Sequence, residues 1–404
     1  MHLSLSTATR IGLNTLGFLG LSIALYLGKS VFIPLVIAAI LAVLLWPVAS
    51  WLSMKAKFPW PLACFTVIGV LVVVNLGFFF GIAAAVPRIV QDLPNPNNPD
   101  QQKELYHKVR TQIKTVSPGS IDEVLPEDPD KSSVYAYVKK TLEGEYITQE
   151  LINLGKLGVS WLWQSVLIVF ILLFLLLEGD MLARQIRAIF GNSRVMQGKV
   201  TAVLAEMAES VRAYLVWRTI VNCGLGLFLG IVYHLVGLRQ PWTWALITAL
   251  FCYVPYLGTI LAGIPPVLDA FIYCSAWHAF FILILYTSVV TFEGYIIVPV
   301  VMGRSMDLNA TTVMISCLYW DLIWGMMGLF LAMPLMAGLR AVCMHVDGWQ
   351  AWGKLMSTSR WIEETEAMER AGQIAPMIEV GDATVVMSPD SPGPVGEPVK
   401  SEST

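Results

Sequence analysis

Residues 241–274 read PWTWALITALFCYVPYLGTILAGIPPVLDAFIYC, and residues 308–342 read LNATTVMISCLYWDLIWGMMGLFLAMPLMAGLRAV. Both stretches are apolar, but each is interrupted near its middle, the first by Pro255 and Gly258 and the second by Gly325 and Gly328. Each arm is marginal for crossing a hydrocarbon core about 30 Å thick. Glycine and proline at membrane depth are tolerated where the backbone is buried in protein or lines a cavity. The pattern therefore predicts two re-entrant broken helical hairpins.

The composition of the whole chain is typical of an integral membrane protein. Of its 404 residues, 56% are hydrophobic and only 14% are charged, and the mean hydropathy is +0.65. We predict an all-α integral membrane protein with about six full spans besides the two hairpins. A signal peptide is the alternative for the first stretch, but no small-residue cleavage site follows it before the second. The spans are placed at residues 11–27, 31–52, 61–86, 157–177, 213–236 and 277–301.

Polar segments divide the chain into four parts. Residues 1–86 hold the first three spans. Residues 87–155 are polar and contain PNPNNPD followed by two patterns of helical period, which predicts a small helical extramembrane domain. Residues 156–342 form the transmembrane core, with a cytoplasmic amphipathic segment at 178–212. Residues 343–404 are a cytoplasmic tail, with the composition of a disordered segment from about residue 381.

Basic residues set the predicted orientation in the membrane. Loops rich in lysine and arginine lie in the cytoplasm, and one short connection carries Arg184, Arg187, Arg194, Lys199 and Arg212. Counting spans from this connection places both termini in the cytoplasm and the 87–155 domain outside. The first hairpin then enters from outside and the second from inside. Opposed broken helices of this kind occur in the inverted repeats of secondary transporters, where they meet near the midplane.

One carboxylate stands alone in an apolar span. Residues 291–306 read TFEGYIIVPVVMGRSM, and Glu293 is the only carboxylate, arginine or lysine between residues 277 and 301. An ionisable side chain at the bilayer centre costs about 2.5–3.5 kcal/mol on insertion scales, so it faces an interior or a watery cavity and finds a partner. The sequence leaves two roles open. Glu293 either binds a cation or carries a proton, or it makes a hydrogen bond that locks its span to a hairpin.

Other candidate positions lie near the hairpins and beside this span. Pro299 cannot donate to the carbonyl of Tyr295 and predicts a helix kink. Asp321 either caps the second arm of its hairpin or faces the substrate, and Asp269 is predicted to be solvated near the outer interface. The five histidines are too scattered for metal ligands. We assign the candidate substrate or ion pathway to Glu293, Asp321, Tyr256 and Asn309.

Four ordered motifs resemble a known family. They are FIPLVIAAILAVLLWPVASWL, LRQPWTWALITALFCYVPYLGTILAGIPPVL, FEGYIIVPVVMGRSMDLN and LYWDLIWGMMGLFLAMPLMAGL. Together they resemble the autoinducer-2 exporter (AI-2E) family of bacterial inner-membrane proteins over residues 10–345. Two positions depart from its pattern: Ala310 stands where proline is frequent, and Cys252 and Tyr253 precede VPY where asparagine is common.

The resemblance implies a multi-span permease of the bacterial inner membrane. It implies a homo-oligomer such as a pentamer, in contact with the lipid bilayer. Some members are linked to export of a small signalling molecule and others to sodium or proton antiport, so the substrate is a small molecule or an ion. No cofactor is expected. The net charge of -3 gives no indication of a nucleic-acid partner.

Enzymatic motifs are missing from the sequence. It contains no G-x-S-x-G elbow, no H-E-x-x-H pair and no Walker A loop, which argues against hydrolysis at a serine or metal and against ATP-driven pumping. We therefore expect no enzyme activity. A membrane scaffold that transports nothing is a further alternative, and the ionisable residues inside the apolar stretches argue against it.

Overall fold

The computed structural model describes residues 7–92, 98–116, 122, 125–143, 146–189, 194–298, 300, 308–346, 348–358, 377–380 and 383–386. Two helices are much longer than a bilayer requires, since α6 has 44 residues and α7 has 43. The α-helices in chain order are α1 Thr7–Leu27, α2 Lys29–Lys55, α3 Trp60–Asp92, α4 Pro99–Val116, α5 Ser133–Glu143, α6 Tyr146–Ile189, α7 Arg194–Val236, α8 Pro241–Phe251, α9 Leu257–Asp269, α10 Ala276–Phe292, α12 Ala310–Trp324, α13 Met326–His345 and α14 Gln350–Met356.

Short elements of other types complete the fold. The 3-10 turn η1 is Pro129–Lys131, and the π-helical segments η2, Ala270–Cys274, and η3, Glu293–Ile297, extend α9 and α10. Strands β1, Met377–Val380, and β2, Ala383–Val386, pair as an antiparallel hairpin. Strand β2 lies in the tail segment for which the sequence predicts disorder. Residues 387–404 of that segment lie outside the described part of the chain.

Seven helices within the described residues are long and apolar enough to cross a membrane. Five of them overlap predicted spans. The other two are the second arms of the hairpins, Leu257–Cys274 and Met326–His345, because η2 lengthens α9 and because α13 continues through Pro334. The first predicted span is a shorter apolar helix, Gly12–Leu27. The all-α membrane core is confirmed, whereas the division into six full spans and two re-entrant hairpins stays a prediction, because helix length alone does not decide which helices cross the membrane.

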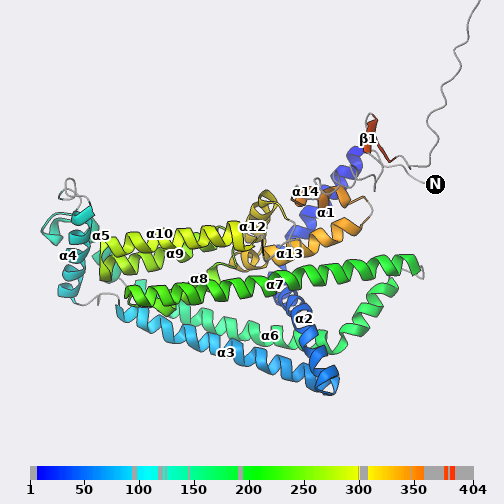
Figure 1. Cartoon of the computed structure of the whole chain (residues 1–404), viewed down its shortest axis with the longest axis horizontal. Coiled ribbons are helices and arrows are strands. Elements are labelled where there is room, and N and C mark those ends of the chain that lie inside the picture. The colour runs from blue at the N-terminus through cyan, green and yellow to red at the C-terminus, as the bar shows by residue number, and fades with distance from the viewer. Residues whose placement is uncertain are drawn as a thin grey trace, which may run out of the picture.

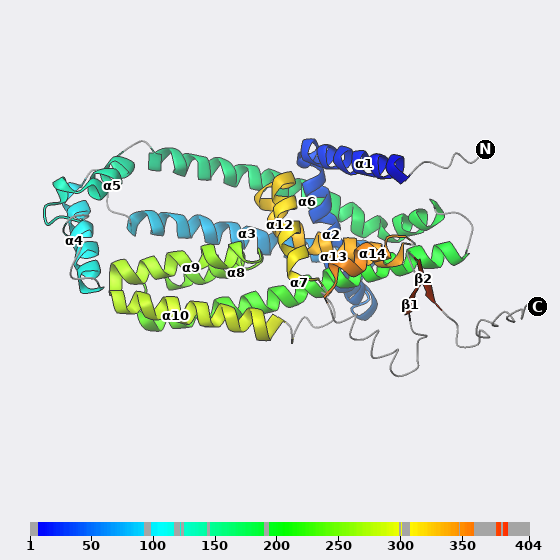
Figure 2. The same ribbon diagram turned by 90° about the horizontal axis from the view of Figure 1, so that it is seen from above.

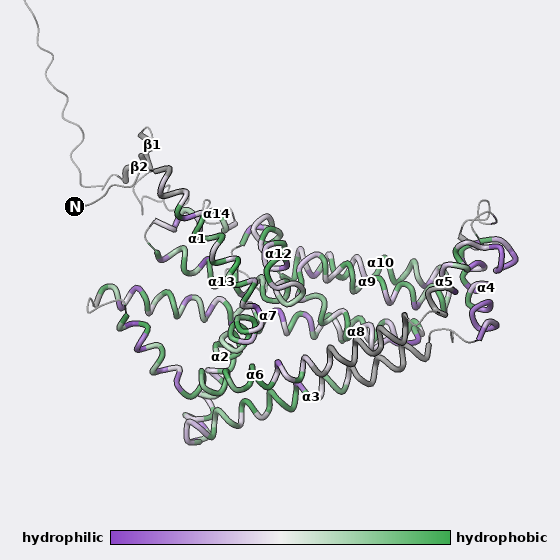
Figure 3. The backbone as a smooth tube through the Cα atoms, turned by 180° about the vertical axis from the view of Figure 1, so that it is seen from behind, coloured by the Kyte–Doolittle hydropathy of each residue, from purple (hydrophilic) through white to green (hydrophobic). Residues whose placement is uncertain are grey.

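The long helices share one direction. Figures 1 and 2 show α3, α6, α7, α8, α9 and α10 running along the long axis, with α2 crossing them. Helices α4 and α5 lie at one end of this axis, and the junction of α6 with α7 reaches the other end. In Figure 3, hydrophobic residues dominate α2 and α6, whereas α4 is largely hydrophilic. The fold is thus an apolar bundle with a polar helical unit at one end.

Both predicted interruptions are present, and each produces a hairpin. Hairpin 1 consists of α8 and α9, joined by a turn at residues 252–256; hairpin 2 consists of α12 and α13, joined at Gly325. Gly325 has φ 63° and ψ -146°, a region that is essentially restricted to glycine. A Cβ on Gly258 would lie 1.8 Å from the carbonyl oxygen of Phe251, and one on Gly328 would lie 1.8 Å from that of Trp320. Both hairpins therefore depend on a glycine that touches the backbone of the first arm.

The two hairpins have their bases at opposite ends of the bundle. Next to hairpin 1, the side-chain amide oxygen of Gln112 in α4 accepts from the N–H of Ala276, the first residue of α10, at 2.9 Å. At the base of hairpin 2, His345 lies 3.2 Å from Glu206, in the part of α7 near the α6 junction. The polar unit that contains α4 and α5 has a small apolar cluster of its own, Tyr106, Leu125 and Tyr135, and also contacts α10 through Gln112.

Two apolar clusters pack around α7. The hairpin 1 cluster joins α7 to α8, α9 and α10 through Leu225, Leu229, Tyr233, Cys252, Ala262 and Ile282. The hairpin 2 cluster joins α7 to the tip of hairpin 1 and to hairpin 2 through Tyr214, Val254, Val313, Cys317 and Leu329. Close approach of α8 to α7 requires small residues: a Cβ on Gly226 would lie 3.1 Å from the carbonyl oxygen of Ala245. Helix α7 therefore packs against both hairpins.

Candidate functional site

The isolated carboxylate of Glu293 is paired with an arginine from another helix. Arg218 of α7 donates from Nη1 to Oε1 of Glu293 at 2.5 Å. Its Nε donates to the backbone carbonyl of Cys252 at 3.0 Å, and its Nη2 donates to the same carbonyl. Arg218 is 8% exposed and Glu293 is 3% exposed. One buried guanidinium therefore connects α7, the tip of hairpin 1 and the π-helical segment that follows α10.

The local helix geometry sets the position of Glu293. In η3 the N–H of Val298 bonds to the carbonyl of Glu293, five residues earlier, so the turn is wider than in an α-helix. This turn directly precedes Pro299, which has no N–H and whose ring crowds the carbonyl four residues before it. Single π-helical turns inside α-helices are frequently found at functional sites. Pro299 itself lies outside the described residues, so the kink remains a prediction.

The ion pair lies where the two apolar clusters meet. Val289 and Val290 of α10 pack against the hairpin 1 cluster, whereas Val298 packs against the hairpin 2 cluster, and Glu293 lies between them. One turn after Arg218, Asn222 is 1% exposed, and its amide O and N have no hydrogen-bond partner among the described residues. Buried polar groups are normally satisfied, so this amide has room for hydrogen bonds to a water or to another polar molecule.

The tip of hairpin 1 has a strained backbone. Tyr256 has φ 61° and ψ -64°, and the N–H of Leu257 bonds to the carbonyl of Pro255 at 2.7 Å. These values describe a γ-turn of the rare, strained hand. Such backbone conformations cost about 1–3 kcal/mol each and cluster at binding and switch regions. Tyr256, the strained residue, lies four residues after Cys252. The carbonyl of Cys252 accepts from Arg218.

Replacing Tyr256 with glycine is expected to stabilise the protein by roughly 0.5–2 kcal/mol, because glycine tolerates positive φ and only part of the gain is lost to backbone entropy. Tyr256→Ala is the matched control, because it removes the ring and keeps the Cβ that causes the strain. The melting temperatures of both variants in detergent should separate, with only the glycine variant above the wild type. Equal shifts in the two variants would contradict backbone strain at this residue.

Asp269 is buried, and its predicted solvated position is wrong. It is 5% exposed, and its Oδ2 accepts from the indole N–H of Trp244 at 2.6 Å and from the backbone N–H of Gln240 at 3.2 Å. Gln240 directly precedes α8 and Asp269 ends α9. The carboxylate therefore joins the two arms at the base of hairpin 1. Asp269 is buried only because α9 folds back against α8. The local sequence around Asp269 does not indicate this contact.

The other sequence-predicted residues lie apart from the ion pair. The capping alternative for Asp321 is wrong, since α13 begins without a side-chain cap and Asp321 is exposed, with its backbone carbonyl accepting from Gly325. Asn309 caps α12 by accepting from the N–H of Thr312 at 2.8 Å, and its amide donates to Leu355 at 2.6 Å. In the described part of the chain, no hydrogen bond or ion pair joins either residue to Glu293.

Arg218 is the site residue that sequence analysis missed. It lies inside the predicted fifth span, where a charge is as conspicuous as Glu293 is in its own span. Arg218 follows Arg212, the last residue of the basic segment, by only six residues, and basic residues at the end of a span are typical of cytoplasmic loops. Two opposite charges in two different predicted spans were the available signal, because buried charges require partners. Asn222, four residues later, continues the same helical face.

A cavity of about 370 Å³ lies elsewhere, among α2, α3, α6 and hairpin 2. Its walls are mainly apolar, with Asn75, Gln164 and Ser165 as polar lining residues and Met327 reaching it from α13. Neither Arg218 nor Glu293 lines it. The ion pair is a stronger candidate site than this cavity, because it combines burial, opposite charges and contact with a hairpin tip.

Comparison with known proteins places this arrangement in a family. A family model described as AI-2E family transporter matches residues 16–347. The chain belongs to the AI-2E transporter family. AI-2 transport protein TqsA of Escherichia coli K12 is 22% identical over 350 residues, covering 86% of this chain and 96% of TqsA. YhhT of the same strain is 21% identical, covering 77% of this chain and 83% of YhhT. YrrI of Bacillus subtilis is 24% identical, covering 78% and 87%.

Membership and fold together establish a membrane transporter. The family is a transporter family, and the AI-2E chain has several apolar helices of membrane-spanning length. The alignments with TqsA of Escherichia coli and YrrI of Bacillus subtilis cover 86% and 78% of this chain. A protein of this kind lies in the lipid bilayer and handles a small substrate. The family resemblance of the four motifs is thereby confirmed.

Proposed function

We propose that this protein is a secondary transporter of the bacterial inner membrane that exports a small polar molecule, and that the Arg218–Glu293 ion pair lies in its pathway. The observation that carries the proposal is the pair itself, held at the tip of a broken hairpin. Broken helices in transporters bring helix ends and free backbone groups to the substrate site. Hairpin 1 supplies such a backbone group, the carbonyl of Cys252.

A gain in folding stability alone does not explain why this ion pair is buried. Desolvation of two charges offsets most of their attraction, and well-packed apolar residues are often as stable or more stable by about 1–4 kcal/mol. Ionisable residues within membrane spans are correspondingly rare and mark substrate or proton pathways. The sequence left open a hydrogen bond that locks the Glu293 span to a hairpin; Glu293 bonds to Arg218 of α7, and it is Arg218 that in turn bonds to the tip of hairpin 1. We propose that the same contact opens and closes during transport.

The bonding of Arg218 supports this role. The guanidinium has two acceptors, the Glu293 carboxylate and the Cys252 carbonyl, so it retains one if the other is withdrawn. A small molecule with hydroxyl and carbonyl groups can donate to Glu293 and accept from Arg218 in place of the direct bond. The unpartnered amide of Asn222 offers a further donor and acceptor one turn away. TqsA is named as an AI-2 transport protein, which agrees with a small polar signal as substrate.

Sodium or proton antiport is the second candidate. A proton on Glu293 would cancel its charge and release it from Arg218, while the Cys252 carbonyl still holds the guanidinium. The coupling ion would then drive the movement of α10 relative to α7. A scaffold without transport is the third candidate, and the cost of burying the ion pair disfavours it.

Flux into liposomes separates these candidates. The purified protein is reconstituted, and the flux of an autoinducer-2-like signal, the internal pH and the internal sodium are measured with no gradient, with a proton gradient and with a sodium gradient. An exporter of a small polar molecule moves the signal, an antiporter requires one of the gradients, and a scaffold gives no flux in any condition. No flux of either signal or ion in all three conditions would refute the proposed transport.

The proposed orientation places both termini in the cytoplasm and residues 87–155 outside. The basic residues near the α6–α7 junction support it. In a cysteine-free background, Glu127→Cys should react with an impermeant maleimide added to intact cells, because Glu127 is 90% exposed on the extramembrane unit. Gln185→Cys, exposed near the α6–α7 junction, should react only after the membrane is opened. The reverse labelling pattern would overturn the orientation.

We also propose a homo-oligomer, of which a pentamer is the form that the family resemblance favours. Large apolar side chains are exposed along the long helices, and lipid or further copies of the chain must cover them. Multi-angle light scattering of the protein in detergent gives the number of copies after correction for bound detergent. A monomer at all protein concentrations would contradict this part of the proposal.

A further inference from the structure

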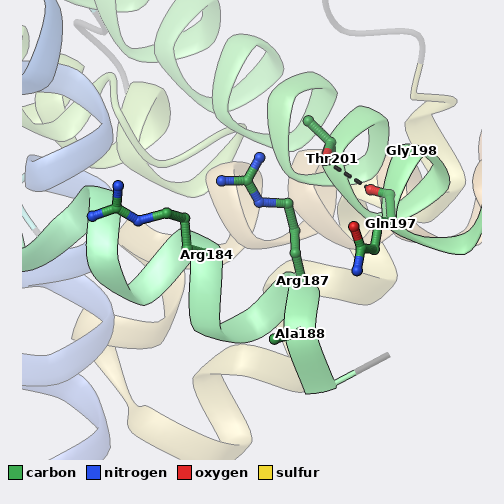
Figure 4. Close-up of a pocket in the computed structure, with 6 residues that line it drawn as sticks. All are labelled: Arg184, Arg187, Ala188, Gln197, Gly198 and Thr201. Atoms are coloured by element: carbon green, nitrogen blue, oxygen red, sulfur yellow. Dashed lines mark hydrogen bonds between the residues drawn. The ribbon is translucent and has the colours of Figure 1, made fainter. Parts of the chain in front are cut away.

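A second cavity, with a polar lining, lies at the junction of α6 with α7. It has a volume of about 390 Å³ and is lined by Arg184, Arg187, Ala188, Gln197, Gly198 and Thr201. Figure 4 shows the two arginines on α6 and the polar side chains of Gln197 and Thr201 on α7, across the space between the helices. The cavity is remote from Arg218 and Glu293 in the chain and shares no lining residue with the ion pair.

The two guanidinium groups in this cavity have unused donors. Arg187 donates from Nε to the carbonyl of Ala183 at 3.1 Å, which leaves both of its Nη atoms available. Within the described residues, Arg184 has no hydrogen bond or ion pair. No carboxylate of the described residues lines the cavity, and the connecting residues 190–193 read FGNS, without an acidic side chain. Two neighbouring positive charges without an anion form an incomplete site, because guanidinium forks match phosphate oxygens.

We propose that this cavity binds the phosphate of an anionic phospholipid headgroup. Arg184 and Arg187 contact the phosphate oxygens, and the Gln197 amide and Thr201 hydroxyl contact the remainder of the headgroup. Thr201 uses its hydrogen to bond to the carbonyl of Gln197 at 2.8 Å and keeps its oxygen lone pairs for a headgroup hydroxyl. Phosphatidylglycerol combines these features, with one phosphate charge and a glycerol that both donates and accepts.

The position of the cavity favours a lipid over free phosphate. The apolar stretch of α6 ends before Glu178, and Arg184 lies six residues later, about 9 Å along the helix. The headgroup layer is about 5–8 Å thick on each side of the hydrocarbon core, and an arginine side chain spans the remaining distance.

Lipid retention tests the proposal directly. Wild-type protein and the Arg184→Gln/Arg187→Gln variant are reconstituted in nanodiscs of phosphatidylcholine containing a minor share of phosphatidylglycerol, and bound lipids are counted by native mass spectrometry after release. The wild type should retain phosphatidylglycerol preferentially, and the variant should bind it roughly 30-fold more weakly, as expected for two basic residues at a membrane surface. Lys55→Gln/Lys57→Gln removes the same charge from the exposed α2–α3 connection and should retain the lipid.

Two further measurements keep the outcomes distinct. Arg184→Lys/Arg187→Lys keeps the charge but loses the fork, and should show intermediate retention at an unchanged melting temperature. Inorganic phosphate is added to lipid-depleted protein to test a free anion. Equal phosphatidylglycerol retention by wild type and the double glutamine variant would overturn the proposal. Stabilisation by inorganic phosphate without lipid retention would also overturn it, in favour of a soluble phosphate ligand.

Discussion

Replacing Arg218 with leucine is expected to reduce the yield of folded protein sharply and to abolish transport. The change leaves the Glu293 carboxylate buried without its partner, and removing one member of a buried pair costs about 3–5 kcal/mol. The yield of monodisperse protein and its melting temperature in detergent measure the first effect, and flux in liposomes measures the second. Arg212→Leu is the matched control on the same helix, since Arg212 contacts the carbonyl of Val43 and not the ion pair.

The double variant Arg218→Leu/Glu293→Leu separates assembly from transport. Removing both charges eliminates the desolvation cost, so the yield and melting temperature should return to wild-type values or exceed them. Flux should stay absent, because both proposed pathway groups are gone. A double variant that assembles and transports like the wild type would show that the ion pair only holds helices together. A double variant that fails to assemble while Arg218→Leu assembles would contradict the buried pair itself.

Gly258→Ala and Gly328→Ala are each expected to destabilise the protein by roughly 1–3 kcal/mol or more. In both cases the new methyl group would lie 1.8 Å from a backbone carbonyl oxygen of the opposite arm, so the arms of the hairpin must separate. Melting temperatures and protease resistance of the purified variants measure this effect. Gly224→Ala is the control, because a Cβ at that position in α7 meets nothing within 4 Å. A wild-type melting temperature for Gly258→Ala or Gly328→Ala would refute the close approach.

Composition and breaker residues predicted most of the fold. Glycine and proline in the two apolar stretches identified both hairpins, since these residues interrupt helices through backbone geometry alone. The second arms end close to the predicted bounds, at Cys274 and at His345. The helix type within these arms was not predictable in the same way, since residues 270–274 continue α9 as a π-helix and α13 continues through Pro334. Proline and glycine indicate an interruption but not the helix type around it.

The candidate site was predicted in part. Glu293 was conspicuous because a lone carboxylate in an apolar span has a recognisable cost. Its partner required the fold, since Arg218 is 75 residues earlier in the chain. Asp269 was misassigned for the same reason, because Trp244 reaches it only after the hairpin closes. The strain at Tyr256 is a backbone property, and proline and glycine nearby indicate a turn but not its hand.

The most direct test of the proposed pathway is the flux of Glu293→Gln in liposomes as a function of pH, at matched protein levels. Glutamine has nearly the same shape as glutamate and can still accept from Arg218, so insertion and assembly should be preserved. The ion pair in the pathway predicts that flux falls about tenfold or more, or loses its pH dependence, because hydrogen bonds to charged groups contribute about 1.5–3 kcal/mol. Near-normal flux with an unchanged pH response would contradict the transport role of Glu293 and leave it a structural contact.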